Sequence, residues 1–204
     1  MATIPLDLDG YTDLPPGKIA NVVTYLETRT PPPAPSDPAL PAGLSIRHVA
    51  DPALAWYRDL YRRIGERWLW FSRAVMPDAG LAAILADPAS EILALERGSD
   101  SLGLAELRRT PGEVEIVMFG VVPEMTGTGA ARLLMNAALR QAWRPEIHRV
   151  WLHTCSFDHP AAVPFYSRSG FRAFKFAIEV SDDPRQGGFL PADAGPHVPF
   201  IRSR

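Results

Sequence analysis

The architecture of the chain follows from residues 113–143, which read EVEIVMFGVVPEMTGTGAARLLMNAALRQAW. Residues 114–122 form a nearly unbroken run of β-branched and large apolar side chains, which is typical of a strand covered on both faces. Pro123 cannot donate to a β-ladder and therefore ends the strand. Apolar residues from Ala130 onward recur at helical spacing. The stretch predicts a strand, a short loop and a helix.

The loop contains Gly127 and Gly129, which let the backbone turn tightly. The first turn of a helix leaves N–H groups without partners and carries the positive end of the helix dipole. A loop of small residues at this point therefore suits an anion such as a phosphate. A plain turn that leads into a helix is the alternative interpretation.

The order of these parts resembles the GNAT superfamily of acetyl-CoA-dependent N-acyltransferases. In that family a strand ends near V-x-P, followed by Gln or Arg, two residues, Gly, one residue, and Gly or Ala at the head of a helix. Here Val121, Val122 and Pro123 precede the loop, and both glycines fit the pattern. Glu124 departs from the pattern, and the loop has no basic side chain.

Residues 160–171 carry a second motif, which resembles the family's A-x-x-x-Y-x-x-x-G-F helix and exit. Together the motifs make the resemblance cover residues 44–180. It implies an α/β fold with a mixed, mostly antiparallel central sheet, a splayed parallel strand pair and flanking helices. A right-handed crossover would place residues 149–154 parallel to residues 114–122.

The resemblance also implies that acetyl-CoA is the co-substrate. Its pyrophosphate would be held mainly by backbone N–H groups of the loop, helped by threonine hydroxyls. A backbone N–H at the end of the strand would polarise the donor carbonyl. The predicted coenzyme-binding residues are Val121, Val122, Met125, Thr126, Gly127, Thr128, Gly129 and Ala130.

Acyl transfer to an amine needs a base, because only about one lysine-like amine in a few thousand is neutral at pH 7. Glu115 is the predicted base, acting through a water, and resembles the glutamate of the histone-acetylating branch of the family. Tyr166 is the predicted acid for the leaving thiolate, matching the helix tyrosine of many members. The alternative interpretations are that Glu115 is an exposed carboxylate at the start of a strand, and that Tyr166 is a tyrosine of the core.

A competing cluster consists of His153, Cys155 and His159, which could suggest a metal site or a Cys/His nucleophile pair. No Cys-x-x-Cys motif supports a metal, so the sequence predicts none. His153 is an alternative base. A Cys155-dependent hydrolase is one rival function.

Length and composition limit the remaining possibilities. The chain has 204 residues, 47% of them hydrophobic, which suits one domain. A net charge of −2 gives no field to attract nucleic acid or an anionic membrane. A single cysteine, no apolar span and no secretory signal at the start favour a soluble, cytoplasmic protein.

Three segments are predicted: an N-terminal extension over residues 1–43, the acyltransferase domain over 44–180, and a tail over 181–204 that packs on the domain. The extension includes a strand over residues 18–30 and a proline-rich connector over 31–41. The strand is predicted at a sheet edge; alternatively, it completes the sheet of another subunit, and a free edge favours a homodimer. The family's last strand is absent, or is replaced by residues 198–201 or by the N-terminal strand.

Further elements precede the central stretch. Residues 44–49 are predicted as a strand, and Asp51 with Pro52 as the N-cap and first turn of a helix that ends at Ile64. A short helix over 77–86 and a hairpin of strands 91–96 and 102–109 follow. Aromatic residues over 68–71 would either line the acceptor pocket or fill the core.

The sequence therefore predicts an N-acetyltransferase that moves acetyl to a primary amine by direct attack. The acceptor is a small molecule or a peptide amine. A catalytically inactive CoA-binding or interaction module on the same fold is the main alternative.

Overall fold

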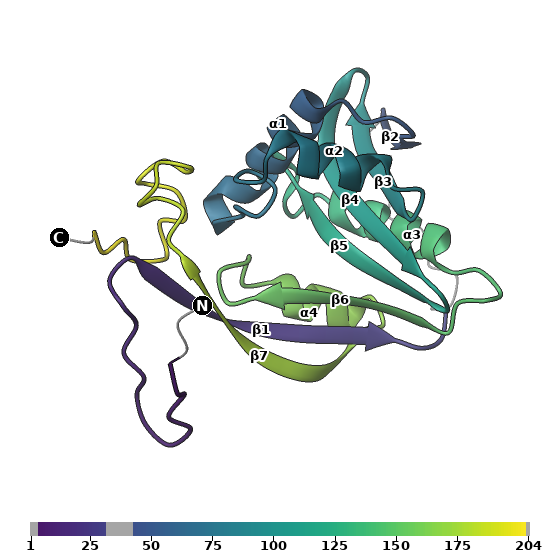
Figure 1. Ribbon diagram of the computed structural model, residues 1–204. Coiled ribbons are helices and arrows are strands. Elements are labelled where there is room, and N and C mark those ends of the chain that lie inside the picture. Colours follow the sequence, from purple (N-terminus) through teal and green to yellow (C-terminus); the bar gives the residue numbers. More distant parts are fainter. Residues whose placement is uncertain (1–3, 32–42, 203–204) are drawn as a thin grey trace.

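The computed structural model describes residues 4–31 and 43–202 (Figure 1). The helices are α1 (Leu54–Gly65), α2 (Asp78–Ala86), α3 (Ala130–Ala142) and α4 (Ala162–Arg168), with 3₁₀ turns η1 (Glu66–Trp68) and η2 (Pro123–Met125). The strands are β1 (Lys18–Thr28), β2 (Leu44–His48), β3 (Ser90–Arg97), β4 (Asp100–Thr110), β5 (Glu113–Val121), β6 (Arg149–Cys155) and β7 (Arg172–Asp182).

The seven strands form one sheet in the order β2-β3-β4-β5-β6-β1-β7. Every neighbouring pair is antiparallel except β5 and β6, which run parallel. The predicted fold class, a mixed and mostly antiparallel sheet with one parallel pair and flanking helices, is therefore confirmed.

Helices cover both faces of this sheet (Figure 1). A Cβ added at Gly103 of β4 would meet Leu134 of α3, whereas one added at Gly120 of β5 would meet Ile64 of α1. Because side chains alternate along a strand, α1 and α3 lie on opposite faces. The middle parts of β3 and β4 are buried between these layers, and every residue of β5 is buried or half-buried.

The N-terminal strand is not at an edge, so that prediction is wrong. β1 lies inside the sheet between β6 and β7, antiparallel to both, with Tyr25 opposite His153 on one side and Lys175 on the other. Ile19, Val23 and Leu26 are buried, which ties the strand into the core. Of the alternatives for the family's last strand, a strand over residues 198–201 is wrong, because these residues form none.

The first helix begins later than predicted. α1 starts at Leu54, and its N-cap position is Ala53, with no side-chain cap, so the prediction of Asp51 as N-cap is wrong. The chain stays extended beyond β2 because the Val49 N–H still donates to the Ile92 carbonyl of β3. The proline connector, apart from Pro31, lies outside the described residues.

The C-terminal segment forms a small apolar cluster of its own. Leu190 and Ala194 pack with Leu69 and with Ile19 of β1. Arg185 lies beneath this segment, and its guanidinium donates to the Ala194 and Val198 carbonyls and to the Asp183 carboxylate. Burial of these residues holds the described part of the C-terminal segment against β1.

Candidate active site

The parallel pair separates halfway along its length. β5 and β6 pair from Glu113 opposite Arg149 as far as Ile116 opposite Leu152. β5 continues to Val121 and β6 to Cys155 without further pairing between them. The resulting gap lies between the carboxyl ends of two parallel strands.

The free edge of β5 presents backbone donors to this gap. The Val122 N–H donates to the Leu102 carbonyl of β4, and Gly103 lies opposite Val121. Because N–H groups alternate between the two sides of a strand, the N–H groups of Val121 and Phe119 point away from β4, toward the gap. Val122 was also predicted to bind the coenzyme, but its N–H already donates to β4 and does not point into the gap.

The glycine loop directly follows this edge. Gly127 and Gly129 have φ of +78° and +89°, values that side chains on Cβ disfavour. Gly129 is the N-cap of α3 and provides no capping side chain. Within the described part of the chain, the N–H groups of Gly127, Gly129 and Ala131 donate no hydrogen bond. The loop and helix start therefore offer several main-chain donors at one point.

Other donors predicted for this loop are already in use. The N–H groups of Met125 and Thr126 donate to Val122 and Pro123 within η2. Thr128 Oγ1 donates to the Met125 carbonyl at 2.8 Å and accepts a long contact, 3.4 Å, from the Ala130 N–H. The anion-binding capacity of the loop thus rests on Gly127, Gly129 and the first turn of α3.

Tyr166 lies on α4 beside the free end of β5. Its ring packs edge-on against Phe119, Phe165 and Phe171, and the residue is buried. Burial raises the pKa of the Tyr166 phenol, and the Asp158 carboxylate raises it further. The phenol therefore stays protonated at neutral pH, and none of the described residues forms a hydrogen bond with its hydroxyl.

Glu115 faces the other side of the sheet. It lies opposite Arg108 of β4 and Trp151 of β6, within the paired part of β5. Its Oε1 is 3.6 Å from Nδ1 of His153, which lies one step closer to the gap. The structure thus brings together the two residues that sequence reasoning treated as alternative bases, but on the opposite face from Tyr166.

A cavity of about 270 Å³ opens beside Glu115. Its wall combines α2 with charged residues of the sheet. Arg73 donates to the Glu106 carboxylate at 2.6 Å, and Glu106 also accepts a hydrogen bond from the Tyr57 hydroxyl. Arg108 forms no ion pair with the described residues. The lining residues are Arg73, Ala83, Ile84, Asp87, Ser90, Glu106, Arg108, Glu115 and Val117.

Asp158 has a role that sequence reasoning missed. Its Oδ2 accepts hydrogen bonds from the Cys155 N–H and the Thr154 hydroxyl at the end of β6, and its Oδ1 accepts one from Trp70 Nε1. Trp70 also packs over Gly120 of β5. Asp158 therefore links the loop after β6 to the aromatic segment after α1, across the open end. An aspartate three residues after a strand's last residue was the available signal.

The cluster of His153, Cys155 and His159 does not converge. His159 Nδ1 accepts a hydrogen bond from the Ala161 N–H, and its ring packs on Trp68. Burial raises the pKa of the Cys155 thiol to about 12, which disfavours the thiolate that a nucleophile requires. Within residues 4–31 and 43–202, no group of three or more His, Cys, Asp or Glu is placed to hold a metal.

None of the helices in the described chain combines the length and the apolar character that crossing a bilayer requires.

Comparisons with known proteins bear on this geometry. A model described as "Acetyltransferase (GNAT) family" matches residues 52–171, more than half of the 204 residues. The match includes the central strand, the glycine loop, α3, β6, α4 and Tyr166. No curated protein matches the chain.

Solved structures show the same fold at low identity. A GCN5-related N-acetyltransferase from Sphaerobacter thermophilus aligns with TM-score 0.59 and 16% identity, covering 80% of this chain and 52% of that one. A tandem GNAT protein from the clavulanic acid biosynthesis pathway aligns with TM-score 0.57 and 17% identity, covering 80% and 53%. A GCN5-related N-acetyltransferase from Kribbella flavida gives 0.54 and 17%, covering 81% and 60%.

This chain thus spans only about half to three fifths of the length of these structures. At such identities they show the fold alone. The family assignment comes from the sequence match, and the splayed strands and glycine loop agree with it. The chain belongs to the GNAT acetyltransferase family.

Proposed function

We propose that this protein transfers acetyl from acetyl-CoA to a primary amine of a small molecule or a peptide, by direct attack of the amine on the thioester. The observation that carries the proposal is the unpaired edge of β5 leading directly into unpaired N–H groups at the start of α3. An extended, amide-bearing arm that is joined to a diphosphate, as in CoA, matches this row of N–H donors.

The coenzyme would lie along this edge. The N–H groups of Phe119 and Val121 point into the gap and can pair with the amide-bearing arm of CoA, as a further strand would. The diphosphate would then meet Gly127, Gly129 and the first turn of α3, where the helix dipole favours an anion. Bound in this way, acetyl-CoA supplies an activated acyl group, so no acyl-enzyme is required.

Tyr166 would serve as the acid for the departing thiolate. Its phenol stays protonated and its hydroxyl forms no hydrogen bond with the described residues, so it can donate to a ligand in the gap. The aromatic contacts with Phe119 and Phe165 fix the ring.

Glu115 and His153 would remove the proton from the acceptor. They lie 3.6 Å apart on the face that carries the cavity, and both are reachable from solvent. His153 is the nearer of the two to the gap, so we assign it to the amine side and Glu115 to the relay of the proton outward, through water. The cavity beside Glu115 would accept the body of the acceptor.

The alternative is a CoA-binding or interaction module without catalysis. The observation that favours it is the loop itself, which carries threonines and no basic side chain to reinforce diphosphate binding. The single, half-buried cysteine fits either function in a reducing compartment such as the cytoplasm.

Isothermal titration with acetyl-CoA, followed by measurement of thiol release with a panel of amines, separates these functions. We expect saturable binding at one site per chain, and thiol release that depends on a primary amine. Binding without amine-dependent release from any member of a broad panel would favour the module. Absence of binding would reject both.

The roles of Glu115 and His153 are tested by Glu115→Gln and His153→Gln. Each should lower kcat while leaving acetyl-CoA affinity within about twofold, and the double variant should lose little more than the worse single variant, because the two act in one relay. Independent, multiplicative losses would contradict a relay.

A further inference from the structure

The outer edge of β7, the last strand of the sheet, has no partner strand in the described chain and is rich in exposed apolar residues. β7 ends the sheet and pairs with β1 on one side; no strand of the described chain covers its other side. Phe176, Ile178 and Val180 are 71%, 52% and 50% exposed, and Val22, opposite Ile178 on β1, is 49% exposed. Edge strands are normally short, charged or covered, because they recruit other strands. This edge is 11 residues long and carries an apolar row.

The backbone of β7 is ready for pairing on that side. The Asp183 N–H donates to the Gly17 carbonyl, and β7 continues from there in regular antiparallel register with β1 as far as Lys175. Ala177 and Glu179 therefore direct their backbone groups toward β1, whereas Phe176 and Ile178 direct theirs outward. The outward groups have no partner strand in the described residues.

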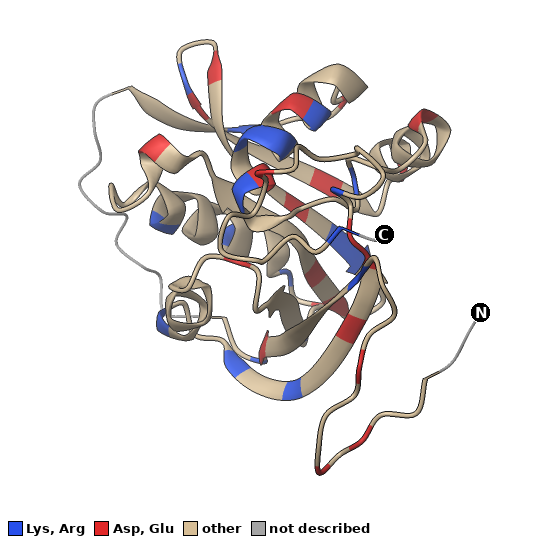
Figure 2. Cartoon of the chain, turned by 90° about the vertical axis from the view of Figure 1, so that its left-hand side faces the viewer, with Lys and Arg blue, Asp and Glu red and all other residues tan. Residues whose placement is uncertain are grey.

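The sequence of β7 is complementary to itself about Ala177. It reads RAFKFAIEVSD, with Lys175 and Glu179 two residues on either side of the centre, and Arg172 and Asp182 five residues on either side. Figure 2 shows basic residues toward one end of this strand and acidic residues toward the other. Phe176 and Ile178 flank the centre directly. When two copies of this strand lie antiparallel about Ala177, each charged residue therefore faces a residue of opposite charge, and each apolar neighbour of Ala177 faces an apolar residue.

We propose that the outer edge of β7 binds β7 of a second copy of this chain, antiparallel, with a two-fold axis at Ala177. In this register Phe176 and Ile178 of the partner subunit exchange backbone hydrogen bonds, because both direct their groups outward. Lys175 lies opposite Glu179 of the partner subunit, and Ala177 lies opposite Ala177 of the partner subunit. Two-fold symmetry makes the interface closed, and the two sheets become one.

The charged side chains are well placed for this contact. The Lys175 ammonium lies over the Tyr25 ring, and Glu179 accepts a hydrogen bond from Asn21 Nδ2, so both lie on one face of the sheet. Phe176, Ile178 and Val180 lie on the other face. A bulge at Tyr25 and Leu26 interrupts regular pairing beyond Lys175, so the central segment from Lys175 to Glu179 carries the register.

A second copy explains this pattern better than a membrane or an unrelated protein. An antiparallel copy of β7 places a complementary residue opposite each charged residue around Ala177, whereas the other partners carry no such matching sequence. It also differs from a dimer built by the N-terminal strand: β1 is paired on both sides and has no free edge. The interface lies two strands away from β6, outside the candidate active site.

Sedimentation of the full chain tests the charge register. We expect a dimer of two 22.4 kDa chains. Lys175→Glu places like charges opposite each other at two symmetric positions and should raise the dimer dissociation constant about tenfold, as should Glu179→Lys. The double exchange restores opposite charges, and its dissociation constant should return to within about threefold of the original. A monomer at all concentrations, or a dimer indifferent to the single exchanges, would overturn the proposal.

Cross-linking tests the two-fold axis without relying on affinity. Residues opposite each other at a non-hydrogen-bonded position have Cα atoms about 4.5 Å apart, which is within disulfide range. Ala177→Cys in a Cys155→Ser background should form a disulfide-linked dimer on mild oxidation. Ser99→Cys, at the tip of the β3–β4 hairpin in the same background, is the control. Equal cross-linking of the two variants would contradict the axis.

Discussion

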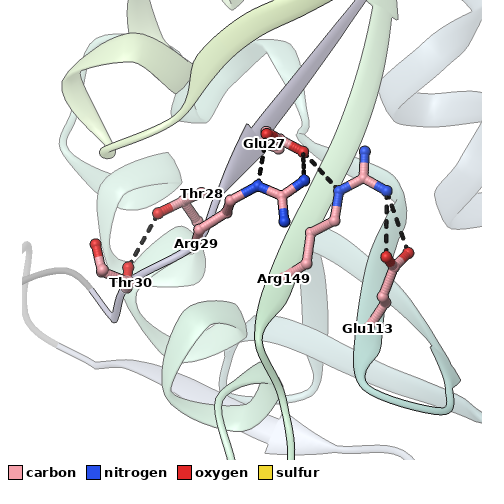
Figure 3. A network of polar contacts seen from close by, with 6 residues as sticks. All are labelled: Glu27, Thr28, Arg29, Thr30, Glu113 and Arg149. Atoms are coloured by element: carbon pink, nitrogen blue, oxygen red, sulfur yellow. Dashed lines mark hydrogen bonds and ion pairs between the residues drawn. The ribbon is translucent and has the colours of Figure 1, made fainter.

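The two ends of the β5–β6 pair differ in how their strands are held. At the paired end, the Arg149 guanidinium binds Glu27 of β1 at 2.6 Å and Glu113 of β5 at 3.2 Å (Figure 3). At the open end, β5 and β6 share no pairing, and the N–H groups of β5 face the gap. β1 follows β6 all the way from Thr28 to Val23. The N-terminal strand therefore pairs with the outer edge of β6 along its length, and this pairing holds β6 in the sheet where β6 separates from β5.

The two ends meet at a row of three buried leucine and isoleucine side chains. Leu26 lies opposite Leu152, and Leu152 lies opposite Ile116 at the last paired position of β5 and β6. All three are at most 2% exposed. The fork in the sheet is thus packed by side chains from the three strands that create it.

Leu26→Ala should have the largest effect, because it empties volume at the fork where neighbouring strands cannot easily close in. We expect the free energy of unfolding in urea to fall by about 3 kcal/mol. Leu8→Ala, at a residue that is 89% exposed, is the control and should change it by less than about 0.5 kcal/mol. A loss below about 1 kcal/mol at Leu26 would mean that β1 does not support the fork.

Tyr166→Phe should affect the open end alone. Removing the hydroxyl should lower kcat about a hundredfold, with acetyl-CoA affinity nearly unchanged. Because burial raises the pKa of this phenol, its ionisation should impose no alkaline loss of kcat in the unmodified protein up to about pH 10. Tyr61→Phe removes a buried hydroxyl that contacts Ser72 and should leave kcat within about twofold. An unchanged rate for Tyr166→Phe would exclude the acid role.

Gly127→Val should weaken coenzyme binding. At φ +78° a β-branched residue strains the loop and turns its N–H groups, so the dissociation constant of acetyl-CoA should rise about tenfold. Gly98 offers a matched control, because it also has a positive φ, +60°, and no atom within 4 Å of an added Cβ, but lies in the β3–β4 turn. Gly98→Val should lower stability without changing affinity. Equal affinity losses from both variants would point to general unfolding.

Arg149→Met should lower the free energy of unfolding by weakening the paired end, and the size of this loss should depend on pH. Hydrogen bonds from Arg29 and Arg149 hold the pKa of Glu27 below its ordinary 4.5. A carboxylate with a lowered pKa stabilises the fold above its ordinary pKa, and this contribution is lost as pH falls through the folded value. We expect a loss of about 1 kcal/mol at pH 7, shrinking toward pH 3. A cost that grows in acid would contradict the ion-pair account.

Local pattern sufficed to predict the strand, loop and helix of residues 113–143, because apolar runs, Pro123 and the two glycines act on their own neighbourhood. The second motif likewise placed Tyr166 on a helix. Local pattern did not predict where β1 pairs. Its buried and exposed residues alternate in the same way whether one edge or both edges have partners.

The contact between Glu115 and His153 depends on the parallel register, which only the assembled sheet defines. Asp158 similarly acquires its role from Trp70, which comes from a segment far away in the chain. In both cases the residue type was visible in the sequence, but the partner was not.

Amide hydrogen exchange resolved by residue, with and without acetyl-CoA, tests the open end most directly. We expect acetyl-CoA to slow exchange at least about tenfold at Phe119, Val121, Gly127 and Gly129, whose N–H groups would gain an acceptor, while Ile116 and Leu152 at the fork stay unchanged. If acetyl-CoA binds and those four amides exchange as before, the coenzyme does not lie along β5, and the account of this cleft is wrong.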